Sequence, residues 1–166
     1  RQAMINLDRM LTRGMSWSGR ERNCVYMNLG QRAGFANVSA VSGLDFIDDA
    51  RAISPVDWDF DGDLDLWIAN RTAPQVRFLR NDNARQPNNW LQLKLQGNGT
   101  TTNRDAIGAR VEVVPTRSED SEFGIRNSKL IKTVRAGEGF LSQHSKWQHF
   151  GLGSAVTIAS VLVRWP

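Results

Sequence analysis

Five aspartates alternate with other residues over the nine positions from Asp57 to Asp65. On one face of a plain strand, carboxylates at this spacing would repel one another. A bound cation removes the conflict, and Ca²⁺ suits the set because it takes about six to eight oxygen ligands. The spacing therefore predicts a calcium-binding loop. A solvated acidic turn without a metal ion is the alternative interpretation, and Mg²⁺ fits less well because it keeps several of its waters.

The order of residues within the loop gives each aspartate a role. Gly62 occupies the sixth position, where a sharp bend or a positive φ is needed. An EF-hand would carry Glu at the twelfth position, where this sequence has Ile68, and the short apolar flanks favour strands over helices. We therefore expect a strand–loop–strand site in which calcium stabilises the fold. The predicted ligands are the side chains of Asp57, Asp59 and Asp61, the backbone carbonyl of Asp63, and Asp65, which completes the shell.

Short β-strands are expected to position this loop. From residue 24 onward, β-prone runs alternate with Gly and Pro, which is typical of antiparallel sheets joined by turns. The predicted strands are 24–29, 35–38, 52–56, 65–70, 76–80, 89–95, 107–114, 129–134 and 155–165. A short helix is predicted within residues 1–14, and an exposed hairpin tip at 119–127. The predicted fold class is all-β: a partial, propeller-like blade carrying the Asp-rich calcium loop, followed by a small antiparallel β-sandwich or barrel.

Residues 24–82 resemble an FG-GAP (VCBS-type) repeat, after an N-terminal extension at 1–23. The resemblance is carried by Asn28-Leu29-Gly30, Gly34-Phe35, the Asp-rich loop and Leu66-Trp67-Ile68. Such repeats are β-propeller blades with calcium in the blade loop, so the resemblance implies the same ion here. The sequence holds one such loop and no second copy at a fixed period, and we therefore do not expect a whole propeller.

Residues 89–166, beyond a polar connector at 83–88, are similar to the ASPIC/UnbV domain of the cartilage acidic protein-like family. The motifs that carry this similarity are Asn89-Trp90-Leu91, residues 103–111, residues 137–143, residues 149–153 and Val163-Arg164-Trp165-Pro166. In that family the domain follows FG-GAP repeats. The resemblance implies an extracytoplasmic calcium-binding protein with no known catalytic residues.

The distribution of charge, the lack of long apolar runs and the cysteine content limit the classes of protein to which the chain can belong. Residues 43–69 hold eight of the 17 acids and one of the 21 bases, which leaves 20 bases and nine acids elsewhere. The bases are scattered, so we expect a solvated basic surface and no nucleic-acid partner, and nucleic-acid binding is a weak third hypothesis. No apolar run reaches the roughly 18 residues of a membrane span. The single cysteine, Cys24, excludes an internal disulfide and is expected to be a buried, inert thiol.

Other candidate sites are less well supported. Ser142 and His144 lack a nucleophile elbow and an orienting acid, and His144 and His149 lack the carboxylates of a zinc site. The loop at residues 103–105 facing Glu138 would suit a second cation, but turn chemistry is the favoured interpretation. Core packing is expected for Trp58, Trp67, Trp90 and Trp165. Trp147 is expected to be exposed, and Trp17, Met4 and Met10 are candidates for an interface.

These features predict a non-catalytic, extracytoplasmic calcium-binding interaction or scaffold module. It would be an accessory subunit docked on a larger, membrane-associated assembly through a protein partner, without spanning the membrane itself. The alternative is a carbohydrate-binding or carbohydrate-acting protein, since calcium-ordered loops and aromatic side chains suit a sugar ligand. A glycosidase would need a pair of carboxylates distinct from the calcium loop, and the sequence offers none.

Overall fold

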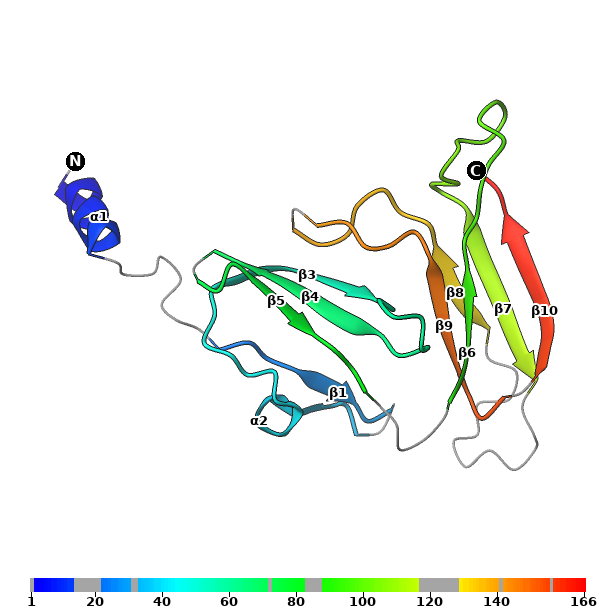
Figure 1. The fold of residues 1–166 in the computed structure, drawn as a ribbon, viewed down its shortest axis with the longest axis horizontal. Coiled ribbons are helices and arrows are strands. Elements are labelled where there is room, and N and C mark those ends of the chain that lie inside the picture. Colours follow the sequence, from blue (N-terminus) through cyan, green and yellow to red (C-terminus); the bar gives the residue numbers. More distant parts are fainter. Residues whose placement is uncertain are drawn as a thin grey trace. The chain divides into compact units, whose positions relative to one another are not determined.

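The computed structural model of the chain is mostly β-strand (Figure 1). It describes residues 2–13, 22–30, 33–71, 73–82, 88–116, 129–140, 142–155 and 157–166. The predicted hairpin tip at 119–127 and Trp17 lie outside these residues. The elements in chain order are α1 (Gln2–Thr12), β1 (Tyr26–Asn28), β2 (Phe35–Asn37), α2 (Ser39–Ser42), β3 (Ala50–Val56), β4 (Asp65–Asn70), β5 (Val76–Leu79), β6 (Asn89–Leu93), β7 (Arg110–Thr116), β8 (Leu130–Thr133), β9 (Gln148–Gly153) and β10 (Thr157–Arg164).

The chain divides into two compact units. Unit 1 comprises residues 1–53 and 67–78, and unit 2 comprises residues 54–66 and 79–166. The acidic loop therefore groups with the C-terminal β domain, whereas the sequence places it in a segment 24–82. The physical reason is that the loop's hydrogen bonds lead to residues 81 and 92 of unit 2.

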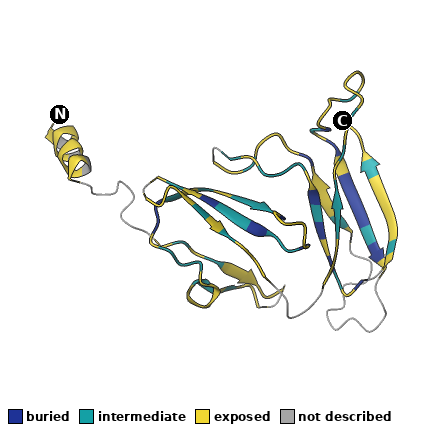
Figure 2. Cartoon of the chain, in the orientation of Figure 1, coloured by how far each residue is buried: buried dark blue, intermediate teal, exposed yellow. Residues whose placement is uncertain are grey.

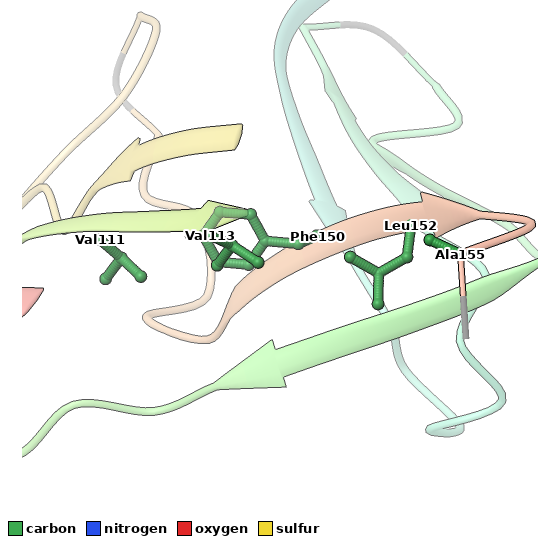
Figure 3. Packing of buried hydrophobic residues seen from close by; sticks show 5 residues of the cluster. All are labelled: Val111, Val113, Phe150, Leu152 and Ala155. Carbon is green, nitrogen blue, oxygen red and sulfur yellow. The ribbon is translucent and has the colours of Figure 1, made fainter. Parts of the chain in front are cut away.

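Unit 2 contains two open sheets that share the larger of its two clusters of buried apolar residues. One sheet has the order β10-β7-β8 and the other pairs β6 with β9, all antiparallel. The core is formed by Val111 and Val113 of β7, Phe150 and Leu152 of β9, and Ala155 (Figure 3). Partly buried side chains from β6, β8 and β10 pack against it. The prediction of an all-β fold is confirmed, and the sheets of the described residues do not close into a barrel or form a propeller.

Burial in unit 2 is concentrated on β7 and β9 (Figure 2). The period of two along β7 places Val111 and Val113 on the same face, and both are fully buried. β10 is mostly exposed. Strand β9 was not predicted because Gly151 and Gly153 lower the strand propensity of its sequence, and its pairing with β6 overrides that preference.

The loop before β7 is held by turn chemistry, as the sequence predicts. The side chain of Asn103 donates to the carbonyl of Ile107 at 2.8 Å and accepts from its N–H at 2.7 Å. Asp105 pairs with Lys146. These contacts give the side chains of Asn103 and Asp105 hydrogen-bond and ion-pair partners within the protein.

Unit 1 contains the hairpin β1-β2 and most of the residues of β3, β4 and β5, which form a sheet in the order β3-β4-β5. The predicted N-terminal helix is present as α1, and Met4 and Met10 on it are exposed. Neither α1 nor α2, the helices of the described residues, is long and apolar enough to cross a membrane.

Several expectations about burial are wrong. Cys24 is exposed, because β1 covers only Tyr26–Asn28 and does not include it. Trp58 is 59 % exposed, and Trp90 and Trp165 are also classed as exposed, because loop and strand ends leave these rings outside the core of unit 2. Trp67 of β4 is only partly buried and packs against Phe78, with ring centroids 4.6 Å apart. The expected exposure of Trp147 is confirmed at 40 %.

Candidate metal centre

The acidic loop connects β3 to β4 through a tight, irregular turn. Val56 ends β3 and Asp65 begins β4, so the sequence runs from one strand to the next through residues 57–64. Two residues of the loop have left-handed backbone, Phe60 with φ 61° and Gly62 with φ 97°. The loop bends at Gly62 because glycine adopts this conformation without steric cost.

The turn brings three of the five predicted ligands together. One carboxylate oxygen from each of Asp57, Asp59 and Asp61 lies within 4.8 Å of the others. Asp57 is buried, whereas Asp59 and Asp61 are exposed. Carboxylate oxygens are hard donors of the kind that Ca²⁺ prefers. The alternation in sequence thus becomes a compact group of negative charges.

Asp57 is the best-positioned member of this group. Its Oδ2 accepts hydrogen bonds from the Gly62 N–H at 3.1 Å and from Gln92 Nε2 at 2.6 Å. Its Oδ1 is buried and has no hydrogen-bond partner among the described residues. Burial raises the pKa of Asp57 above its ordinary value, and the nearby charge of Asp61 acts in the same direction. A buried carboxylate oxygen without a partner is costly unless a cation or donor meets it.

Asp65 and Asp63 lie outside the group of three. The carboxylate of Asp65 is fully buried and accepts backbone N–H groups from Trp58 at 3.0 Å and from Asn81 at 2.8 Å. These two bonds attach the first residue of β4 to the start of the loop and to Asn81. The backbone N–H of Asp63 donates to Asp61 Oδ1 at 2.9 Å, which closes the turn.

The group of three has little compensating positive charge among the described residues. Among the described residues, its ion-pair partner is Arg80, 3.9 Å from Asp59 and already paired with Asp82 at 2.7 Å. The acids just before β3 are different, since each has an arginine: Asp45 pairs with Arg22, Asp48 with Arg77 and Asp49 with Arg51. Each of these three acids is therefore neutralised by an arginine, whereas the three carboxylates of the loop share one distant arginine.

Gly62 also packs against strand β6 of the same unit. A Cβ atom added at this position would lie 1.8 Å from Trp90 Nε1, so the indole covers the turn closely. The same indole stacks on the ring of His149 of β9, with centroids 5.9 Å apart. The loop is therefore held in place by β6 and β9 as well as by its own hydrogen bonds.

A cavity of about 460 Å³, here called the loop-side cavity, opens beside Asp57 within unit 2. Its lining includes Asp57, Gln92, Lys132, Glu138, His144 and Trp147. Gln92 and Lys132 were not predicted as site residues, because each lies on a predicted strand and neither belongs to a ligand-binding pattern in the sequence.

The expectation that His144 has no orienting acid is wrong. Glu138 Oε2 lies 2.7 Å from His144 Nδ1, and the hydroxyl of Ser142 donates to the Glu138 carbonyl. Spacing along the chain did not reveal this pair because a loop folds Glu138 back onto His144. The hydroxyl of Ser142 thus donates to a backbone carbonyl, whereas the nucleophile of a triad would donate to the histidine.

Residues 99–166 match the family model described as ASPIC and UnbV. A comparison with curated proteins gave no match. The ASPIC and UnbV match covers β7 to β10 and thus most of the loop-side cavity, including Lys132, Glu138 and His144. Asp57 and Gln92, which join the cavity to the acidic loop, precede the matched residues.

The residues of the loop fit a calcium ion. The donors are oxygen atoms, three carboxylates converge, and a buried Asp57 oxygen lacks a partner. Asp57, Asp59 and Asp61 would hold the ion. Bound calcium would supply positive charge there and thereby stabilise the turn.

Proposed function

We propose that the chain is a non-catalytic, extracytoplasmic calcium-binding interaction module. The observation that carries the calcium site is the convergence of Asp57, Asp59 and Asp61, of which Asp57 has a buried oxygen without a hydrogen-bond partner among the described residues. Loops of this kind bind calcium where it is plentiful, at about 10⁻⁴–10⁻³ M for extracellular modules, which favours a place outside the cytoplasm. The ion has a structural role in this proposal.

The interaction role is supported by two features. The ASPIC and UnbV match at residues 99–166 is compatible with an interaction module. In unit 1, the hairpin β1-β2 exposes Tyr26, Met27 and Phe35, the last at 69 %. Large exposed apolar side chains that cluster are typical of protein interfaces. In this proposal the chain is an accessory subunit of a larger, membrane-associated assembly, and residues 24–82 form an FG-GAP-like segment.

Calorimetric titration of Ca²⁺ into the chain, with thermal melts in calcium and in EGTA, tests the calcium site. At a hundredfold excess over Kd, calcium should stabilise the fold by about 2.7 kcal/mol. This corresponds to a rise in Tm of roughly 5–11 °C, at about 2–4 °C per kcal/mol. Equal melting temperatures in calcium and in EGTA would exclude a structural calcium site.

A matched pair of variants assigns the effect to the loop. Asp59→Asn removes one ligand charge and should abolish most of the calcium-induced rise in Tm. Asp8→Asn makes the same charge change on the exposed helix α1 and should leave the rise intact. A loss of the response in both variants would show that total charge, and not the loop, determines it.

Carbohydrate binding is the second candidate. The observation that favours it is the loop-side cavity, which has polar groups on its lining and the 40 %-exposed Trp147 on its wall. A cavity of this volume lies in the range of about 300–1,000 Å³ that is usual for small-molecule sites.

A further inference from the structure

Lys132 is the charged group of the loop-side cavity that the protein leaves without a counter-ion. Its ammonium lies 5.7 Å from the centroid of the Phe150 ring, and it has no hydrogen bond or ion pair among the described residues. The side chain of Lys132 is exposed, although partial burial of the ammonium lowers its pKa below the ordinary value against the opposing charge of Glu138. An anionic acceptor on a ligand would give this ammonium the counter-ion that the described residues do not supply.

The other charges of the cavity are compensated. Glu138 lies 2.7 Å from His144 and 3.4 Å from Arg135, so these three groups satisfy one another. Asp57 accepts hydrogen bonds from Gln92 and Gly62, and in the proposed function calcium neutralises it as well. With calcium bound, the uncompensated charge facing the cavity is the positive charge of Lys132, which favours an anionic ligand.

Trp147 adds an apolar surface to this positive group. Its ring packs edge to face against Phe60 of the acidic loop, with centroids 6.1 Å apart, and still remains 40 % exposed. An exposed indole beside amide, imidazole and carboxylate groups suits a ligand that has both a C–H face and several hydroxyls. A sugar ring has this character, and a carboxylate on it would meet Lys132.

We propose that the loop-side cavity binds an acidic sugar, with its carboxylate on Lys132 and its ring beside Trp147, and that calcium in the acidic loop is required. This inference rests on the proposed calcium site, because without the ion the carboxylate of Asp57, which lines the cavity, repels an anion there.

Calorimetry on the full chain tests the inference with three probes: D-galacturonate, D-galactose and acetate. Each is titrated in saturating calcium and in EGTA, with a blank titration that removes the heat of calcium binding to galacturonate itself. Galacturonate should bind in calcium at least tenfold more tightly than galactose, which lacks the charge, and than acetate, which lacks the ring. Its binding should be lost in EGTA.

Three variants locate the binding. Lys132→Met keeps the length of the side chain and should weaken galacturonate binding at least tenfold, with the calcium-induced rise in Tm unchanged. Arg9→Met, on α1, removes the same charge far along the chain and should bind normally. Asp59 does not line the cavity, so Asp59→Asn should affect galacturonate only through the loss of calcium. In calcium this variant should therefore fail to bind galacturonate, as the unaltered chain does in EGTA.

The outcomes separate this inference from the calcium proposal. If calcium raises Tm but galacturonate does not bind, the cavity inference is overturned while the calcium site stands. Equal binding of galactose or acetate, equal binding in EGTA, or normal binding by Lys132→Met overturns the inference too. If calcium has no effect on Tm, the proposed calcium site fails, and the calcium requirement fails with it.

Discussion

At the scale of single residues, Gly62 combines two requirements that glycine alone meets. Its φ of 97° is disfavoured for any residue with a Cβ atom, and that atom would lie within the Trp90 indole. The residue thus sets both the bend of the acidic loop and the distance between loop and β6. Asp57 depends on that bend, because the N–H of Gly62 is one of its two donors.

We expect Gly62→Ala to destabilise the chain and to weaken calcium binding. The backbone strain costs about 1–3 kcal/mol, and displacing Trp90 costs a similar amount, about 1–3 kcal/mol. Denaturant unfolding and calcium titration measure both effects. Gly99→Ala is the control, since Gly99 also has a positive φ, of 76°, but open space around it. Equal losses in the two variants would contradict the packing of Trp90 on the turn.

At the scale of elements, Glu112 forms ion pairs with basic residues on or next to each strand of the sheet β10-β7-β8. It is buried on β7 and lies 3.3 Å from Arg110 of the same strand, 3.2 Å from Lys129 before β8, and 3.6 Å from Arg164 of β10. The hydrogen bond from Lys129 and the surrounding positive charges hold the pKa of Glu112 below its ordinary value of 4.5. A buried acid with three basic neighbours is therefore ionised in the folded protein.

The sign of the pH dependence follows from that lowered pKa. Because the folded pKa lies below the unfolded one, the ionised form of Glu112 stabilises the fold above about pH 4.5, and this contribution is lost as the pH falls through the folded pKa. Glu112→Gln should therefore lower Tm at pH 7, and its difference from the unaltered chain should shrink below about pH 4.5. Thermal melts between pH 3 and 7 measure this. A difference that stays constant with pH would show that the ion pairs do not stabilise the sheet.

At the scale of the whole molecule, the acidic loop belongs to the unit that holds the ASPIC and UnbV match. Asp57 is bonded to Gln92 of β6, and Asp65 to Asn81, so both ends of the loop are attached to unit 2. The acids of unit 1 are bonded elsewhere: Asp48 accepts hydrogen bonds from Arg77 and Asn70, and the bond from Arg77 keeps its pKa low. Loss of calcium should therefore lower the local stability of unit 2 and leave that of unit 1 unchanged.

Hydrogen exchange with and without EGTA measures this division. Chelation should speed exchange at residues 57–66 and in β6, which carries Gln92 and Trp90. Exchange at residues 48–53 and in the part of β4 after residue 66 should change little, because their arginine pairs do not depend on calcium. Uniform acceleration across both units would show that they unfold together.

Much of the β framework was predictable from the sequence because its signals are local. The alternation of β6 and the limits of β4 at Asp65 and Asn70 are properties of neighbouring residues, and the helix in residues 2–12 follows from its periodicity. Strand β9 was not predictable, because its glycines disfavour a strand and its pairing partner, β6, lies about sixty residues earlier in the chain. The exposure of Cys24 likewise depends on where β1 begins.

A tight acidic loop between two strands was predictable from nine consecutive residues, because the alternating aspartates and the glycine at the sixth position are local features. Tertiary structure decided which of them meet: Asp57, Asp59 and Asp61 converge, while Asp65 turns to backbone donors. It also decided that Gln92, Lys132, Glu138 and Trp147 would surround one cavity beside the loop. The physical reason is that a carboxylate's partners depend on distances in space, and folding brings together residues that lie up to ninety positions apart.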